Sequence, residues 1–297
     1  MRVFVTGATG YIGSTIVREL IDAGHQVTGL ARSDQAAASL AAAGAAVHRG
    51  TLEDHESLRA GAAAADGVIH NAFKNVGPDT DFAAACETDL YAIQTLGEAL
   101  VDTGRPFVIT SGTAVAPLGR RCMEDDAAAG GLRSESEVAA LAFAKRGVRA
   151  SAVRLAPSVH GDTDKKGFVP SLIDFAREKG VSGYVGDGAN RWPAVHVLDA
   201  ARLFRLALEE APAGARLHGA AEEGVALRDI AVAIGRQLDL PVTSIPADEA
   251  ADHFSWFAMF ASIDNPTSSV LTHTRLGWRP VHPGLIADID EGHYFKN

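Results

Sequence analysis

The sequence predicts an α/β fold: a doubly wound parallel sheet with helices on both faces, followed by a smaller C-terminal unit. Two observations carry this prediction. Short apolar runs alternate with amphipathic helical patterns through residue 155, which is typical of parallel strands joined by crossover helices. A glycine-rich turn joins the first apolar run to the first helical pattern. The 297 residues suffice for one large α/β unit or two interleaved domains.

Composition excludes several classes of protein. A net charge of -10 disfavours binding to a phosphate backbone, so no nucleic-acid partner is expected. Cys86 and Cys122 lie far apart without a Cys-x-x-Cys pair, which argues against a disulfide framework, and no metal site is predicted. No apolar run reaches the ~18 residues of a membrane span. Met1 leads directly into the first strand without a secretion signal, so we expect a cytoplasmic protein without a membrane partner.

The first strand and helix carry the strongest signal. Val3 to Val5 form a short buried strand, and a helix follows with apolar positions at Ile16, Val17, Leu20 and Ile21. Between them, Gly7 permits a sharp turn, Gly10 lets backbone amides approach a diphosphate, and Gly13 lets the helix lie against the strand. The helix N-terminus adds unpaired N–H groups and the positive end of its dipole. We expect a dinucleotide held by this turn, through Gly7, Thr9, Gly10, Tyr11, Ile12 and Gly13.

The remaining elements follow by pattern and by turn residues. Strands are expected at 26–31, 46–49, 67–70, 106–110, 149–155 and 217–220, and helices at 34–43, 57–64, 81–101, 168–179, 200–209 and 226–238. In parallel sheets, ligands lie beyond the carboxyl ends of the strands. The candidates at these ends are Leu52 beside adenine, Asn71, Ala72 and Phe73 beside the ribose and nicotinamide, Lys74, Ser111 and Thr113.

The residues after the second strand indicate which dinucleotide binds. An NAD site usually has an acidic residue here for the ribose 2′-hydroxyl, whereas this chain has Ala31-Arg32-Ser33. A guanidinium and a hydroxyl suit a 2′-phosphate, so Arg32 and Ser33 predict NADP rather than NAD. The alternative is that Arg32 is a solvated loop residue and Asp34 takes the acidic role.

Three segments resemble the extended short-chain dehydrogenases/reductases, also called the NAD(P)-dependent epimerase/dehydratase family. They are Thr6-Gly-Ala-Thr-Gly-Tyr-Ile-Gly13, the stretch 182–199, and Leu276-Gly-Trp-Arg-Pro280. The resemblance implies a Rossmann domain of residues 1–155 with 193–212, and a substrate domain of residues 156–192 with 213–297. It implies a small-molecule substrate near Arg191, Trp192 and His196, although His196 is also expected to order its loop. It further implies a homodimer through the helices at 81–101 and 134–146.

The chain departs from this family at its catalytic residues. The family's Tyr-x-x-x-Lys motif is missing: the tyrosine position falls on Gly131 and the lysine position on Glu135. In that helix, Ser134 and Glu137 form an expected capping box, with Val138, Leu141 and Ala142 as its apolar face. The family's serine falls on Gly112, between Ser111 and Thr113, and Asp89 stands where the family often has an asparagine.

These patterns lead to one functional hypothesis and two alternatives. The first is an NADP-dependent oxidoreductase that acts on a carbonyl or alcohol, with Ser111 or Thr113 binding the oxygen. His160, Lys74 or water would supply the proton in place of the tyrosine. The alternatives are an NADP(H)-binding redox sensor without turnover, and an epimerase or dehydratase with a tightly held cofactor.

Overall fold

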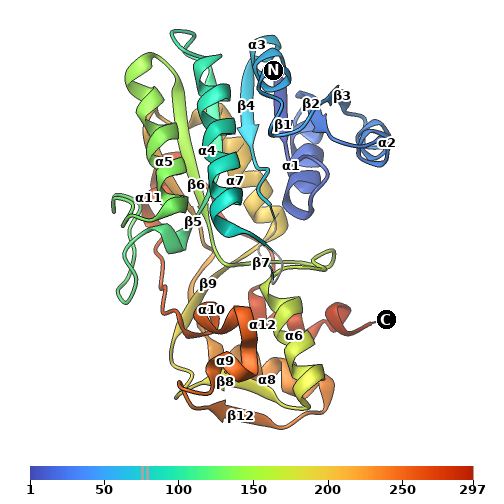
Figure 1. Cartoon of the computed structure of the whole chain (residues 1–297), viewed down its shortest axis with the longest axis vertical. Helices are drawn as coiled ribbons and strands as arrows, with labels where there is room; N and C mark the ends of the chain where they lie inside the picture. Colours follow the sequence, from blue (N-terminus) through green and yellow to red (C-terminus); the bar gives the residue numbers. More distant parts are fainter. Residues whose placement is uncertain (75–76, 78–79, 297) are drawn as a thin grey trace.

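The centre of the protein is a seven-stranded sheet in which all strands run parallel (Figure 1). The computed structural model describes residues 1–74, 77 and 80–296. In spatial order the strands are β10 (Ala215–Gly219), β6 (Arg149–Leu155), β5 (Pro106–Gly112), β4 (Gly67–His70), β1 (Arg2–Thr6), β2 (Gln26–Ala31) and β3 (Ala46–Arg49). The strand order reverses between β1 and β4, and ligands of such sheets bind beyond the carboxyl ends at this reversal. The predicted doubly wound parallel sheet is confirmed.

Helices cover both faces of this sheet, as the alternation of side chains along β1 shows. Val3 and Val5 pack into one core with α1 (Tyr11–Asp22), α2 (Asp34–Ala42) and α7 (Val197–Glu210). Phe4 points to the opposite face, into a second core with α3 (His55–Ala64), α4 (Phe82–Glu98) and α5 (Leu132–Ala142). No helix in the described part of the chain has the length and apolar character needed to cross a bilayer.

A smaller unit lies beyond the carboxyl edge of the sheet, in the lower half of Figure 1. A third core with many aromatic side chains holds it together. Its strands are β7 (Ser158–His160), β9 (Arg191–His196) and β11 (Glu222–Ala226) in one sheet, and β8 (Ser182–Val185) and β12 (Val242–Ile245) in another. Its helices are α6 (Phe168–Lys179), α8 (Leu227–Leu238), α9 (Ala250–Phe254), α10 (Ala258–Ser262) and α12 (Leu285–Asp290). Short 3₁₀ turns lie at Thr113–Val115, Phe143–Arg146, Ser255–Phe257 and His293–Phe295.

The chain passes between the two units more often than the expected boundaries allow. β10 pairs with β6 in the large sheet, although residues 213–219 were expected in the smaller unit. α11 (Val270–Leu276) also returns to the large unit, where Trp278 is fully buried and its indole N–H donates to the Asp199 carbonyl at 3.0 Å. β9 pairs instead with β7 and β11 of the smaller unit. Strand pairing between distant segments decides these memberships, and chain order alone does not predict it.

The start of α5 differs from the expected capping box. Ser134 lies inside the helix and its hydroxyl donates to the Gly130 carbonyl at 2.8 Å. Glu137 is fully buried and faces the sheet, whereas Val138 is 58% exposed, so the expected apolar face is wrong. The buried carboxylate is stable there because Arg154 of β6 donates to both of its oxygens, at 2.9 and 2.6 Å.

Candidate functional site

The glycine turn after β1 has the geometry that a dinucleotide requires. Gly7 has a φ of +68°, and a Cβ on Gly13 would lie 1.9 Å from the Gly7 carbonyl oxygen, so no larger residue fits between turn and helix. Gly10 is the N-cap of α1, and no side chain caps this 12-residue helix. The first amides of α1 therefore remain available for an anionic ligand. The residues of this turn fit the diphosphate of a dinucleotide.

The loop after β2 contains the residues that were expected to determine whether NADP or NAD binds. Ser33 caps α2, with its hydroxyl accepting the Ala36 amide at 3.2 Å, and Arg32 is exposed beside it. Asp34 begins α2 and accepts a hydrogen bond from Arg49 at 2.6 Å. The acidic candidate thus already has a cation partner, while the Arg32 guanidinium faces solvent.

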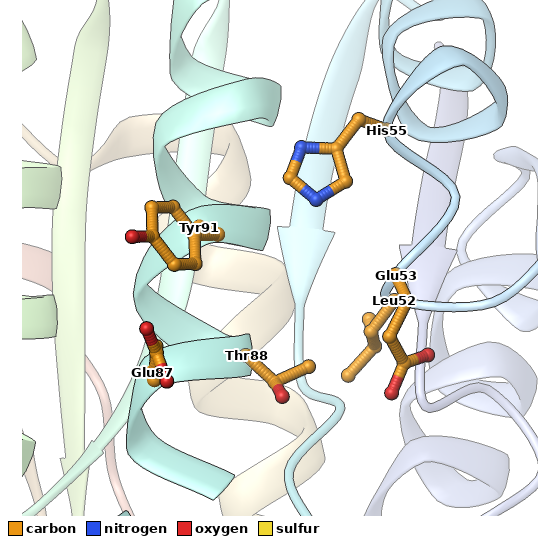
Figure 2. Close-up of a pocket in the computed structure, with 6 residues that line it drawn as sticks. All are labelled: Leu52, Glu53, His55, Glu87, Thr88 and Tyr91. Carbon is orange, nitrogen blue, oxygen red and sulfur yellow. The ribbon is translucent and has the colours of Figure 1, made fainter. Parts of the chain in front are cut away.

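A small cavity of about 140 Å³ lies beside Leu52, the expected neighbour of adenine (Figure 2). One wall comes from the residues before and at the start of α3, and the other from α4. The lining residues are Leu52, Glu53, His55, Glu87, Thr88 and Tyr91. Lys74 also lies on this side, because its ammonium is 3.6 Å from the Glu53 carboxylate. This ion pair holds Lys74 on the side expected for adenine.

The end of β4 packs tightly against the glycine turn. A Cβ on Gly7 would lie 2.7 Å from the Ala72 nitrogen, and the Asn71 side chain lies 3.1 Å from where a Gly13 Cβ would be. Asn71 also accepts the Thr110 hydroxyl at 2.9 Å, and the Ala72 amide donates to the Thr6 hydroxyl at 3.3 Å. The ends of β1, β4 and β5 are therefore joined directly, and Asn71 and Ala72 lie beside the glycine turn. Their expected contact with the ribose and nicotinamide stays a prediction.

The two hydroxyls at the end of β5 are both engaged by other residues. The Ser111 hydroxyl donates to Glu137 at 2.8 Å, and the Thr113 hydroxyl donates to the side-chain oxygen of Asn265 at 2.5 Å. Both residues are buried. Burial raises the pKa of Glu137, but hydrogen bonds from Arg154 and Ser111 and the charge of Arg154 outweigh it and lower the pKa overall. An ionised Glu137 holds the Ser111 proton away from any other acceptor.

A second polar network reaches from the end of β1 to the first turn of α5. The Thr6 hydroxyl is 2.8 Å from Nδ1 of His70, and Nε2 of His70 is 3.2 Å from Asp89. The other oxygen of Asp89 accepts from the Arg133 guanidinium. Burial raises the pKa of Asp89, but the hydrogen bond from His70 and the Arg133 charge lower it overall, so Asp89 is ionised. His70 is therefore held on both sides, as expected for a structural histidine.

His160 belongs to a buried cluster formed with the C-terminal segment. Its Nδ1 is 3.0 Å from Asp288, while its Nε2 is buried without a hydrogen-bond partner among the described residues. The Tyr294 hydroxyl donates to Asp288 at 3.3 Å and accepts the Gly161 amide at 3.0 Å. The Tyr11 hydroxyl, from the first turn of α1, is also buried without a partner in this part of the chain, and burial raises its pKa. The cluster thus adjoins the turn that would hold the diphosphate.

Two of the residues expected around the substrate, Arg191 and Trp192, lie in different environments. Trp192 is only 1% exposed, packs against Phe168 and Phe257, and donates its indole N–H to the Phe260 carbonyl at 3.2 Å, so it belongs to the core. Arg191 is exposed and forms a bidentate pair with Asp264, at 3.0 and 2.9 Å. Large aromatic side chains near a turn are buried wherever a neighbouring core can receive them.

His196 orders the chain at the start of α7, as expected. Its Nδ1 accepts the Leu198 amide at 3.3 Å, and its ring stacks on His282 with centroids 4.8 Å apart. His196 is the N-cap of α7, and Asp199 lies in its first turn. Asp199 accepts the amides of Val281 and His282, both at 3.0 Å, and so ties the C-terminal segment to α7.

The titration of Asp164 makes the stability of this buried region depend on pH, and this dependence can be measured. Asp164 accepts the amides of Gly167 and Lys166, and burial raises its pKa to about 6. Between pH 4 and 6 the Asp164 carboxyl is therefore protonated in the folded chain and largely ionised in the unfolded chain. The free energy of unfolding consequently falls as the pH rises through this window. An Asp164→Asn variant cannot titrate. Its stability relative to the wild type should rise by roughly 2 kcal/mol from pH 4 to 7.

Urea unfolding at pH 4, 5, 6 and 7 measures this difference, because each pair of curves shares every other titrating group. The asparagine oxygen can still accept the Gly167 amide, which makes the substitution conservative. A stability difference that stays constant with pH would contradict the raised pKa.

Sequence reasoning missed several residues of these networks. Arg133 and Glu137 lie four residues apart on α5. This is the spacing of the family's Tyr and Lys, and placing that motif two residues later in the sequence would have pointed to both residues. Asp288 and Tyr294 carried no local signal, because they reach His160 and Gly161 from more than a hundred residues away.

Comparisons with known proteins agree with this geometry. The model of the NAD dependent epimerase/dehydratase family matches residues 3–218. An uncharacterized protein of Schizosaccharomyces pombe is 50% identical over 99% of this chain and 100% of its own length. A 2-alkyl-3-oxoalkanoate reductase of Stenotrophomonas maltophilia is 30% identical over 74% of this chain and 69% of its own length. The structure of dTDP-glucose 4,6-dehydratase from Streptomyces venezuelae with NAD bound has a TM-score of 0.77 at 21% identity, covering 99% of this chain and 96% of that one. The chain belongs to the NAD dependent epimerase/dehydratase family.

Proposed function

We propose that this protein is an NADP-dependent oxidoreductase that interconverts a carbonyl and an alcohol on a small molecule. The observation that carries the proposal is the uncapped N-terminus of α1 behind the Gly7–Gly13 turn, with the Arg32 guanidinium exposed at the end of β2. The relative that is named a 2-alkyl-3-oxoalkanoate reductase supports a carbonyl as the reacting group. When bound, NADPH supplies the hydride. The amides at the N-terminus of α1 bind the diphosphate, and Arg32 binds the 2′-phosphate.

The preference for NADP is tested by replacing Arg32. An Arg32→Ala variant should bind NADPH about tenfold more weakly, because a charge-assisted hydrogen bond to the 2′-phosphate is lost, while NADH binding changes little. Titration followed by nicotinamide fluorescence measures both affinities. Arg18→Ala is a matched control, since Arg18 is exposed on the far part of α1. Stronger binding of NADH than of NADPH by the wild type would contradict the NADP assignment.

The groups proposed to handle the substrate oxygen are Ser111, Thr113, His160 and Lys74. Ser111 lies at the end of β5, and its use would require its hydroxyl to leave Glu137. His160 is oriented by Asp288 and its Nε2 has no partner among the described residues, which suits a proton donor, but its side chain is buried. Lys74 would have to leave Glu53. Each of these roles therefore needs a rearrangement on binding.

A second candidate function is NADP(H) binding without turnover, as in a redox sensor. The internal hydrogen bonds of Ser111 and Thr113 favour it, because both hydroxyls already have acceptors. NADPH fluorescence in the presence of aldehydes, ketones, 3-oxo acids and sugar nucleotides separates the candidates. Oxidation of NADPH by a carbonyl supports the oxidoreductase, and binding without oxidation across the panel supports the sensor. Conversion of a sugar nucleotide without net NADPH consumption would indicate an epimerase or dehydratase.

The assembly and location of the protein stay predictions. A homodimer through α4 and α5 would cover exposed apolar side chains on these helices, among them Tyr91 and Val138. A cytoplasmic location remains the expectation from the sequence.

A further inference from the structure

Arg133 lies at the carboxyl edge of the central sheet, at the start of α5. It stands in the first turn of α5, its side chain is 19% exposed, and its guanidinium lies 4.3 Å from the centre of the Phe73 ring. The same guanidinium donates to the Thr110 carbonyl at 2.8 Å. Phe73 follows β4 and Thr110 belongs to β5, so the cation lies at the carboxyl ends of two adjacent central strands. Ligands of doubly wound sheets bind beyond this edge.

The structure shows which side chains of α5 reach the end of β5. They are Arg133, bonded to Thr110, and Glu137 one helical turn later, bonded to Ser111. Gly131 and Glu135, where the resemblance to the family placed its Tyr and Lys, are both exposed. The helix thus presents a guanidinium and a carboxylate, four residues apart, to the place where that motif would act.

The Arg133 guanidinium is oriented and still has donors to spare. Asp89 holds one terminal nitrogen and the Thr110 carbonyl the other, while the face of Phe73 limits its tilt. A guanidinium has five N–H groups, so Nε–H and one N–H on each terminal nitrogen have no acceptor among the described residues. Because Asp89 is itself anchored by His70, the cation cannot swing away from this position without breaking a buried network.

We propose that Arg133 binds the reacting oxygen of the substrate, and that the substrate is an anionic carbonyl compound of the 2-oxo or 3-oxo acid class. Guanidinium groups pair with two oxygens at once, and these acids place a carboxylate oxygen beside the ketone oxygen. This inference rests on the proposed oxidoreductase function. In reduction, the carbonyl carbon receives the hydride from NADPH and the C=O electron pair moves to the oxygen. Arg133 stabilises that alkoxide by hydrogen bonding. A water molecule then gives a proton to the alkoxide and becomes hydroxide.

Binding without turnover tests the assignment. Protein saturated with NADP⁺ cannot reduce a ketone, so calorimetric titration with acetoacetate, pyruvate and the neutral ketone butanone reports affinity alone. We expect the two acids to bind at least about tenfold more tightly than butanone, because only they pair with the charge on Arg133. Equal affinity for acids and butanone, or no acid binding, would overturn the proposal.

Two substitutions of Arg133 separate a role in acid binding from a purely structural role. Arg133→Gln should weaken acid binding about tenfold or more, and Arg133→Lys should restore part of it. A merely structural role for Arg133 would give the same loss of acid binding in both variants, and that result would overturn the proposal.

Arg146 offers a matched control in the same structure. It lies just beyond the other end of α5, pairs with Glu98, and stands 5.2 Å from the centre of the Phe143 ring, so it has the same kinds of contact as Arg133. Arg146→Gln should leave acid binding unchanged. NADPH titration of each variant, expected to match the wild type within about twofold, separates substrate binding from cofactor binding.

The outcomes distinguish this inference from the proposed function. Tight acid binding that depends on Arg133, without NADPH oxidation by any acid, would support the anion site and contradict the oxidoreductase. NADPH oxidation by a carbonyl at an undiminished rate in Arg133→Gln would support the oxidoreductase and overturn the role of Arg133.

Discussion

Replacing Gly13 by alanine is expected to abolish NADP(H) binding. The added Cβ would lie 1.9 Å from the Gly7 carbonyl oxygen and 2.8 Å from its carbon. Both neighbours are backbone atoms, so the turn itself must move away from α1, and the amides around Gly10 lose their common direction. A displacement of this size in a binding turn costs about a hundredfold or more in affinity. Fluorescence titration with NADPH measures the loss.

The same substitution should lower the free energy of unfolding by about 1–3 kcal/mol, as overpacking does elsewhere. Gly10→Ala is the comparison that separates binding from folding. Its Cβ would lie 3.3 Å from the Gly7 oxygen, a tight but tolerable contact, and would project at the N-terminus of α1. We therefore expect Gly10→Ala to weaken NADPH binding with little change in urea stability. Wild-type affinity in Gly13→Ala would contradict the dinucleotide assignment.

Replacing Glu137 by glutamine is expected to give the largest loss of stability among single substitutions in the described networks. Glu137 and Arg154 are both fully buried, and Arg216 adds a third guanidinium bond at 3.1 Å. The variant would leave the Arg154 charge buried without a carboxylate, with only the neutral glutamine oxygen and Nε2 of His218, at 3.5 Å, beside it among the described side chains. Removing one partner of a buried pair costs about 3–5 kcal/mol. Urea unfolding followed by circular dichroism measures this loss.

Glu98→Gln provides the control for this prediction, because Glu98 pairs with Arg146 on the exposed surface. An exposed pair contributes roughly 0–1 kcal/mol, so the control should lie close to the wild type. The pKa of Glu137 is lowered in the folded chain, so its contribution is present at neutral pH and is lost on acidification. The gap between wild type and Glu137→Gln should accordingly narrow as the pH falls. Equal stability of the two glutamine variants at pH 7 would contradict the buried network.

Much of the large unit could be predicted from local patterns. The strands Gln26–Ala31, Ala46–Arg49, Gly67–His70 and Arg149–Leu155 have the predicted bounds, and so does the helix Phe168–Lys179. Apolar runs bounded by glycine or polar residues indicate such strands because the backbone turns where the side chains stop being buried. The roles of Gly7 and Gly13 were also predictable, since they depend on residues only a few positions away.

The contacts around the end of β5 and in the smaller unit could not be predicted in the same way. Ser111 and Thr113 were expected to face a ligand, but their acceptors, Glu137 and Asn265, lie 26 and 152 residues further along the chain. Trp192 was expected over the substrate, but the smaller unit supplies an aromatic core that buries it. In α5, helical periodicity indicated Val138 as buried, but the charge of Arg154 on the neighbouring strand turned Glu137 inward instead.

The sequence by itself determined the doubly wound sheet and the turn that suits a diphosphate, because strand alternation, helical period and glycine conformations are properties of neighbouring residues. Only the tertiary structure decided which charged groups meet. Arg133 reaches Asp89 across 44 residues, and His160 reaches Asp288 across 128. A buried charge is stable only beside a partner, and that partner comes from whichever distant strand or helix packing brings alongside.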